Sequence, residues 1–297
     1  MSTAEVTGAR PDPAAGSAGP VAPVIHWIRF LRSELSLIFL RWRNLALLAV
    51  LAAIPVLIGV ALKLATGGGR GDGQGPAFFL QVAGNGVFLA LASLTALLIL
   101  VLPLAVAVVA GDSVAGEAGH GTLRYLLTIP AGRTRLLGIK YAALVVFCVA
   151  ACAVVTVAAL VIGAALFPVG PVTLLSGTTI SLGAGLLRLA LVALYVAGAL
   201  ASLAAIGLAI STFTEHPIGA IAAIMVLALA SEVSDSVPQF AVVHPYLPTH
   251  WWLSFDALLR SPIAWPDLMH GLLSFGIYVV IFGAIAWARF TTADVTS

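Results

Sequence analysis

The sequence is poor in charge: Asp, Glu, Lys and Arg make up only 9% of its 297 residues, against roughly 25% in an ordinary soluble domain. Hydrophobic residues account for 61% of the chain, and the mean hydropathy is +1.11. These figures exclude a soluble globular enzyme and a disordered chain. They also exclude nucleic acid as a partner, because too few basic groups are present to neutralise a phosphate backbone.

Cysteine is scarce too, and the common catalytic motifs are missing. Cys148 and Cys152 lie four residues apart in an apolar run, so we expect them to pack as small apolar side chains and to form neither a disulfide nor a metal site. The sequence has no H-E-x-x-H, no G-x-S-x-G and no phosphate-binding G-x4-G-K-[ST] motif. We therefore expect a chain that is not an enzyme, binds no cofactor or metal, and does not hydrolyse ATP.

Runs without charge predict the architecture, because a membrane-spanning helix needs about 20 mostly apolar residues. Six runs lack Asp, Glu, Lys and Arg, which gives an all-α integral membrane protein with six transmembrane helices. The alternating segments of about 10 residues that mark a membrane β-barrel are missing from the sequence. The spans are expected at 44–65, 86–110, 141–167, 187–212, 217–233 and 268–289.

Two further features qualify these spans. Pro55 and Pro103 fall inside the first and second spans, where we expect local kinks because proline removes a helical hydrogen bond. Residues 168–186 contain two prolines and several glycines, so we expect a short connector there at the outer interface.

Lysine and arginine are unevenly divided between the two sides of the predicted membrane domain. Ten of the 14 lie on the side of the N-terminus, so the positive-inside rule predicts that both termini and loop 111–140 are cytoplasmic. We expect a multi-pass protein of the bacterial plasma (inner) membrane. Residues 1–23 lack the apolar core of a signal peptide, which predicts a disordered cytoplasmic tail, and residues 291–297 are expected to form a second tail.

Residues 24–43 predict an amphipathic helix ahead of the first span. Apolar residues recur in steps of three and four from Val24 to Trp42, and basic residues lie toward another face. This pattern suits an interfacial helix in the inner headgroup layer. The alternative is a cytoplasmic coiled-coil seam, which the short pattern of two and a half heptads makes less favoured.

The loop between the second and third spans holds the densest charge cluster near the membrane. Thr122 is placed to cap the start of a helix, Leu123, Leu126 and Leu127 form an apolar face at spacing i, i+3, i+4, and Pro130 limits its length. A short helix that exposes leucines must bury them against the membrane surface, its own bundle or a partner protein.

The array D-x2-A-G-E-x3-G-T-L-x2-L-L-x2-P-x2-R-x2-L-L-x2-K over residues 112–140 resembles the signature loop of ABC-2 type transporter permeases. The resemblance extends over about 24–290 and includes six spans and an N-terminal interfacial helix. In that family the loop contains a coupling helix that docks on a separate ATPase subunit, which implies this role for Thr122 to Leu127. The alternative, that these residues only cap the two spans at the interface, stays open. The implied ATPase-coupling residues are Asp112, Glu117, Gly121, Thr122, Leu123, Arg124, Leu126, Leu127, Pro130 and Arg133.

The outer loop 234–267 is broken by five prolines and is rich in aromatic residues, which predicts two short outer helices. The aromatic side chains form either an outer gate that releases substrate or a membrane-interface belt alone. His244 and His250 could hold a metal only with further ligands, so we favour interfacial or hydrogen-bonded roles. The candidate gate residues are Tyr246, Trp251, Trp252 and Phe255.

The resemblance implies a permease subunit of an ABC transporter that exports a hydrophobic or amphipathic substrate, such as a lipid or a drug-like molecule. ATP and Mg would be bound by a partner ATPase, a second or related permease would complete the pathway, and membrane lipid would surround the complex. An ion-coupled secondary transporter remains an alternative, although no ionisable residue lies at a predicted bilayer midplane. The other alternative is a non-transporting membrane scaffold protein.

Overall fold

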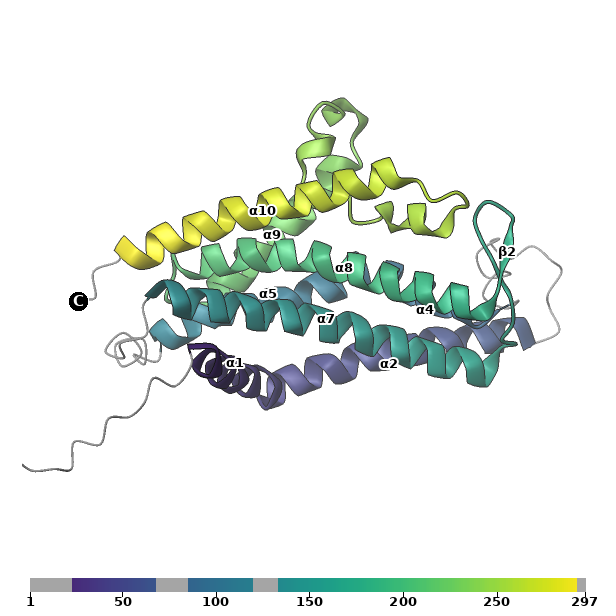
Figure 1. Ribbon diagram of the computed structural model, residues 1–297, viewed down its shortest axis with the longest axis horizontal. Coiled ribbons are helices and arrows are strands. Elements are labelled where there is room, and N and C mark those ends of the chain that lie inside the picture. The colour runs from purple at the N-terminus through teal and green to yellow at the C-terminus, as the bar shows by residue number, and fades with distance from the viewer. Residues whose placement is uncertain (1–22, 68–84, 120–132, 293–297) are drawn as a thin grey trace, which may run out of the picture.

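Long helices run side by side along the longest axis of the protein (Figure 1). The structure is a computed structural model that describes residues 23–67, 85–119 and 133–292. The helices are α1 (Pro23–Phe39), α2 (Trp42–Gly67), α4 (Val87–Leu98), α5 (Val101–Gly119), α7 (Arg133–Leu166), α8 (Leu182–Ser211), α9 (Pro217–Asp235) and α10 (Trp265–Thr292). The shorter elements are β1 (Val172–Thr173), β2 (Thr179–Ile180), and the 3-10 helices η1 (Pro238–Phe240), η2 (His244–Tyr246) and η3 (Ser254–Leu259).

Five of the described helices, α2, α7, α8, α9 and α10, are long and apolar enough to cross a membrane. The pair α4 and α5 makes a sixth candidate if its two helices count as one span. The protein is therefore a multi-pass helical membrane protein, as the uncharged runs predicted.

The second predicted span is not one continuous helix. The chain bends by 55° between α4 and α5, with the break just ahead of Pro103. Proline at position 103 offers no N–H to the carbonyl of Ile99, and its ring clashes with that carbonyl. The expected kink at Pro103 is thus a full break between two helices, and α5 continues to Gly119.

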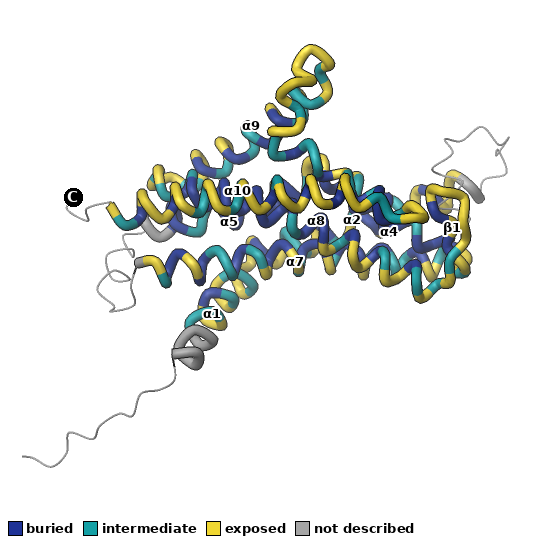
Figure 2. The backbone as a smooth tube through the Cα atoms, turned by 45° about the horizontal axis from the view of Figure 1, so that its top comes forward, coloured by how far each residue is buried: buried dark blue, intermediate teal, exposed yellow. Residues whose placement is uncertain are grey.

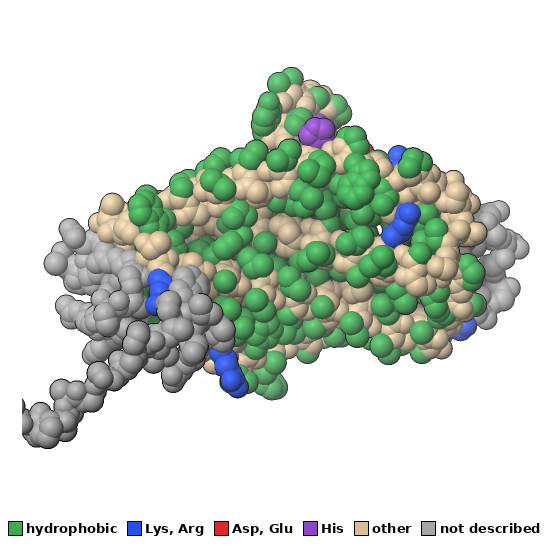
Figure 3. All heavy atoms as spheres, in the orientation of Figure 1, with side chains coloured by type: hydrophobic (Ala, Val, Ile, Leu, Met, Phe, Trp, Pro, Cys, Tyr) green, Lys and Arg blue, Asp and Glu red, His purple; other side chains and the backbone are tan. Residues whose placement is uncertain are grey.

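Helix α8 forms the centre of the bundle. It packs mainly against α10, α5 and α7, and 72% of its most apolar stretch is buried, against 22% for α2 and α9 and 17% for α10. Figure 2 shows the exposed residues on these outer helices. In Figure 3 the visible face is largely hydrophobic and has few charged side chains, which is the surface that a helix facing lipid needs.

The bundle has two chemically different ends. We call the end with α1, the end of α5 and the start of α7 the basic end. The opposite end, with strands β1 and β2, is the hairpin end (Figure 1).

Helix α9 has 19 residues, against 30 in α8, so at 1.5 Å per residue it is about 16 Å shorter. The segment that follows α9 projects from the side of the bundle (Figures 1 and 2).

The connectors are more ordered than the sequence suggested. Within loop 111–140, both flanks are helical, because α5 ends at Gly119 and α7 begins at Arg133. Within connector 168–186, β1 and β2 pair antiparallel, and Gly177 supplies the positive φ of 80° in the turn between them. In place of two outer helices, the described outer loop has three 3-10 helices.

Two glycines let α4 and α7 approach each other closely at the hairpin end. A Cβ atom added at Gly86 would lie 2.4 Å from the carbonyl oxygen of Gly163, and one added at Gly163 would lie 2.4 Å from that of Gly86. The backbone of Gly86 also donates to Pro168 at 2.9 Å. The start of α4 is therefore fixed against the end of α7 by backbone contact.

Candidate functional site

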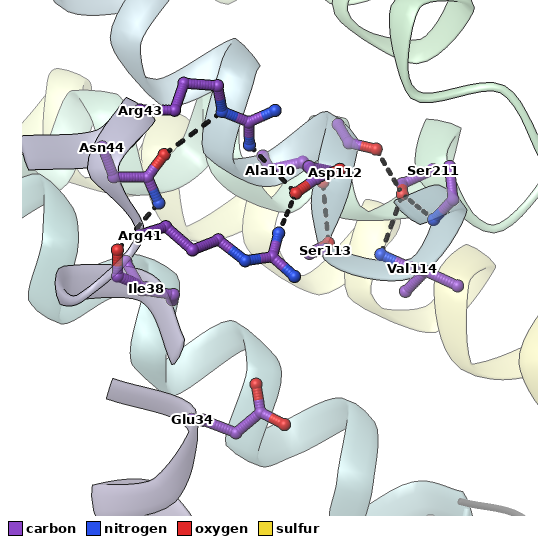
Figure 4. Close-up of polar contacts among 12 residues, drawn as sticks. Glu34, Ile38, Arg41, Arg43, Asn44, Ala110, Asp112, Ser113, Val114 and Ser211 are labelled. Atoms are coloured by element: carbon purple, nitrogen blue, oxygen red, sulfur yellow. Dashed lines mark hydrogen bonds and ion pairs between the residues drawn. The ribbon is translucent and has the colours of Figure 1, made fainter. Parts of the chain in front are cut away.

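Charged side chains join the α1–α2 elbow to α5 at the basic end (Figure 4). Arg41 and Arg43 both pair with the Oδ2 atom of Asp112, the second through Nη2 at 2.9 Å. The Asp112 side chain is only 10% exposed, while about half of each arginine side chain is exposed. One shielded carboxylate thus holds two half-exposed guanidinium groups, and we call this group the elbow clamp.

The elbow itself is fixed by Asn44, which is 2% exposed. Its side-chain Nδ2 donates to the carbonyl oxygen of Ile38 at 2.8 Å. That carbonyl belongs to the last turn of α1, where helical carbonyls lack partners within the helix. Asn44 therefore ties the end of α1 to the start of α2 and sets the angle between them.

A second charge pair joins α1 to α7. The Nζ atom of Lys140 lies 3.6 Å from Oε2 of Glu34, and the two side chains are 3% and 10% exposed. Buried charges are costly unless they are paired, so this pair fixes the face of α1 that packs on the bundle. Nothing in the sequence indicates this pair, because Glu34 and Lys140 lie more than 100 positions apart in the chain.

The elbow clamp and the Glu34–Lys140 pair border one small cavity of about 40 Å³. A site of this size admits water and is too small for a lipid or drug-like substrate. The charges at the basic end therefore connect helices, and the geometry does not form a substrate pocket there.

Ser211, the last residue of α8, connects that helix to α5. Its Oγ donates to the carbonyl oxygen of Gly111 at 2.9 Å and accepts from the backbone N–H groups of Val114 and Ala115 at 3.1 and 2.9 Å. The serine is fully buried. The stretch of α5 around Asp112 is thus tied to the elbow on one side and to α8 on the other.

The structure describes few of the predicted coupling residues. The side chain of Asp112 is described, and Glu117 and Arg133 lie in α5 and at the start of α7, with their side chains outside the description. The short helix predicted from Thr122 stays a prediction. The coupling residues outside the described part of the chain are Gly121, Thr122, Leu123, Arg124, Leu126, Leu127 and Pro130.

The four candidate gate residues occupy different environments. Trp252 and Phe255 are buried in the core at 4% and 5% exposure, whereas Tyr246 is 75% exposed. Trp251 links the outer segment to the bundle: its Nε1 donates to the carbonyl oxygen of Pro245 at 3.1 Å, and its own carbonyl accepts from the hydroxyl of Tyr195 at 2.9 Å. A gate formed by these residues stays a prediction.

The two outer-loop histidines share Asp235, the last residue of α9. Nδ1 of His250 lies 2.6 Å from Oδ1 of Asp235, and Nδ1 of His244 lies 3.8 Å from the same oxygen. Within the described residues there is no group of three or more His, Cys, Asp or Glu side chains that could hold a metal. The contacts agree with the hydrogen-bonded role favoured from the sequence.

The partners of Asp112 were not identified from the sequence, although a signal was present. Arg43 directly precedes one uncharged run and Asp112 directly follows another. If both runs cross the membrane, these charges meet at the same interface, which brings their side chains within reach. Ser211 offered no comparable signal, because a serine in an apolar helix has no distinctive pattern.

The family model for "ABC-2 family transporter protein" matches residues 39–231, which is more than half of the chain. The match begins at the α1–α2 elbow and ends within α9, so it contains the elbow clamp and Ser211. No curated protein matches the sequence.

Proposed function

Because the chain belongs to the ABC-2 family of transporter proteins, we propose that it is the permease subunit of an ABC transporter that exports a hydrophobic or amphipathic substrate. Members of this family are membrane transport subunits and are not themselves catalytic ATPases. In this proposal ATP and Mg bind to a separate ATPase subunit, which docks on the segment between α5 and α7.

We place the basic end in the cytoplasm of a bacterium, with the bundle in its plasma membrane. Arg41, Arg43 and Arg289, exposed at this end, support that orientation by the positive-inside rule. Helix α1 leaves the bundle at an angle (Figure 2), which supports a position in the headgroup layer.

The observation that carries the proposal is the double attachment of α5. The elbow clamp ties Asp112 to the elbow after α1 and to α2, and Ser211 ties the same turn of α5 to α8. Residues 120–132 follow directly after α5. A push by the ATPase on the predicted coupling helix would therefore reach three other helices through bonds between packed elements.

The substrate pathway would lie between two permeases, because six spans supply half of a pathway in this family. Only 22% of the most apolar stretch of α2 and of α9 is buried, and these helices carry exposed aliphatic side chains such as Leu57, Leu64 and Val226. Apolar walls from α2, α5 and α9 favour a lipid or a lipophilic drug over a charged substrate. The segment after α9, with Trp251 and Trp252, would open to release it.

The experiment replaces Leu126 and Leu127 together with Asp in the tagged full-length chain, co-expressed with an ABC ATPase subunit that copurifies with the wild type. Charges on the apolar face should remove the buried contact with the ATPase. We expect the ATPase to be lost on affinity purification, and substrate-stimulated ATP hydrolysis in proteoliposomes to be lost with it.

The matched control is Leu126→Met with Leu127→Met, which keeps an apolar face and should keep the ATPase bound. Unchanged assembly of the Asp variant would refute docking at this helix. Transport that survives ATP depletion but stops when the ion gradient is removed would instead support a secondary transporter.

A further inference from the structure

An apolar crevice runs between α7, α8 and α10 near the basic end. Its floor is formed by the buried side chains of Leu137, Ala205 and Leu208, and its walls include Gly138 of α7 and Gly283 of α10. The cavity volume is about 230 Å³, which exceeds the roughly 150 Å³ of an apolar cavity that accepts benzene. The crevice is therefore large enough for a stretch of hydrocarbon.

The crevice is open because α10 has no side chain at one position along its wall. A Cβ atom added at Gly283 would meet no atom within 4 Å. Gly283 lies one helical turn from Trp287 and one turn from Val279, which line the same wall. From Trp287 to Val279 the wall is about 12 Å long at 1.5 Å per residue.

The polar side chains that border the crevice already have hydrogen-bond partners. The Trp287 Nε1 donates to Oγ1 of Thr134 at 2.9 Å, and the hydroxyl of Tyr141 donates to the carbonyl oxygen of Ala201 at 3.3 Å. An occupant therefore has no need of polar groups, and only apolar surface remains for it to cover.

The position of the crevice relative to the membrane–water interface indicates what kind of molecule would occupy it. Trp287 is half exposed and Arg289 follows in the last turn of α10, as expected for residues at a membrane–water interface. Exposed aliphatic residues, among them Ile277, Val280 and Ile281, continue along α10 away from that level. A chain anchored at the interface and running along α10 would enter the crevice within its first 12 Å or so.

We infer that this crevice binds one acyl chain of a membrane phospholipid, whose headgroup lies at the level of Trp287 and Arg289. It lies on α7, α8 and α10, apart from the α2, α5 and α9 walls assigned to the transported substrate. The bound lipid is thus a resident component of the permease, and its binding does not depend on the proposed ATPase partner.

The test fills the crevice with Gly283→Leu in the full-length chain. The protein is reconstituted in phosphatidylglycerol vesicles that contain a lipid with a photoreactive diazirine in the middle of one acyl chain. We expect peptides of α7 and α10 that line the crevice to be labelled in the wild type. In Gly283→Leu the label should fall about tenfold or more. This is the loss expected when about two methylene groups of the acyl chain can no longer be buried in the crevice.

The matched control is Gly276→Leu, because Gly276 also lies on α10, seven residues away, and a Cβ atom there also meets nothing within 4 Å. This variant should be labelled like the wild type. In a second measurement, phosphatidylglycerol added to delipidated protein should raise the Tm of the wild type and Gly276→Leu but not of Gly283→Leu.

Three results would overturn the inference. The first is equal labelling of Gly283→Leu and Gly276→Leu, and the second is an equal rise in Tm for both variants. The third is efficient bismaleimide cross-linking of Gly283→Cys between two copies of the chain, which would make a second permease the occupant. All three readouts are taken without an ATPase, so they are separate from the test of transport.

Discussion

The basic end and the hairpin end of the bundle are held together by different chemistry. At the basic end, charged side chains from separate helices pair with one another: Arg41 and Arg43 with Asp112, and Lys140 with Glu34. Arg43, Asp112, Glu34 and Lys140 lie in helices, and Arg41 lies at the elbow between α1 and α2. Charged side chains thus link helices at this end, in addition to the neutral hydrogen bonds of Ser211 between α8 and α5.

At the hairpin end, polar side chains bond to backbone carbonyls. Nη1 of Arg188 donates to the carbonyl oxygens of Leu258 and Arg260, both at 2.8 Å. Nδ2 of Asn85 donates to those of Gly170 and Pro171 at 3.1 and 2.9 Å. The first two carbonyls lie at the end of the 3-10 helix η3, and the other two lie in the connector between α7 and β1.

The difference follows from the elements that meet at each end. Backbone groups of irregular segments must find hydrogen-bond partners near a membrane. Nearby polar side chains therefore bond to these backbone groups. At the basic end, the arginines of the elbow clamp are about half exposed, whereas the Glu34–Lys140 pair is shielded. We therefore expect the half-exposed elbow clamp to be the more adjustable contact and the backbone-directed bonds of the hairpin end to be the more rigid, which would suit the proposed input of force at the basic end.

The largest effect is expected from Lys140→Met, which leaves the shielded carboxylate of Glu34 without this cation. Removing one partner of a buried ion pair costs about 3 kcal/mol or more, and we expect this loss in the free energy of unfolding measured by SDS titration in mixed micelles. The double variant Glu34→Gln with Lys140→Met should recover part of it. Strictly additive effects of the two single substitutions would show that the pair is not coupled.

A smaller effect is expected from Arg188→Gln at the hairpin end, because the carbonyls of Leu258 and Arg260 would lose a charged donor. Bonds of this kind contribute about 1.5–3 kcal/mol, so we expect a loss of about 2 kcal/mol that varies little with NaCl. The control is Arg260→Gln, whose pair with Asp256 is about half exposed and should change stability by less than about 1 kcal/mol. Equal losses in the two variants would remove the evidence for a rigid hairpin end.

Much of the fold could be predicted because lipid imposes a simple rule on sequence. The helices α2, α7, α8, α9 and α10 all fall on uncharged runs, since a span must be long and apolar. Cys148 and Cys152 are buried and unbonded to each other, as their place in an apolar run indicated. The break after Leu98 was foreseen only as a kink at Pro103, because the 55° bend depends on how α4 and α5 pack on different neighbours.

Less of the candidate site could be predicted. The motif identified Asp112, but its partners Arg41 and Arg43 lie about 70 positions earlier in the chain, and a pairing over that separation is set by helix packing. Glu34 and Ser211 form no local pattern with their neighbours. The hairpin at Val172 and Ile180 is also too short for an alternating pattern to mark it.

The smallest effect is expected from Asp112→Asn, which keeps the size of the side chain and removes its charge from the elbow clamp. Because each arginine is about half exposed, the loss in the free energy of unfolding should be about 1 kcal/mol or less at low ionic strength. It should shrink as NaCl rises to about 1 M, where the screening length falls to about 3 Å.

The control for this salt dependence is Ser211→Ala, which removes neutral hydrogen bonds from the same turn of α5. Its loss should be about 1–3 kcal/mol, because buried N–H groups lose their partner, and it should not change with NaCl. Suppose instead that Asp112→Asn cost several kcal/mol at every salt concentration. The elbow clamp would then act as a fixed structural bond like that of Arg188, and the basic end would be no more adjustable than the hairpin end.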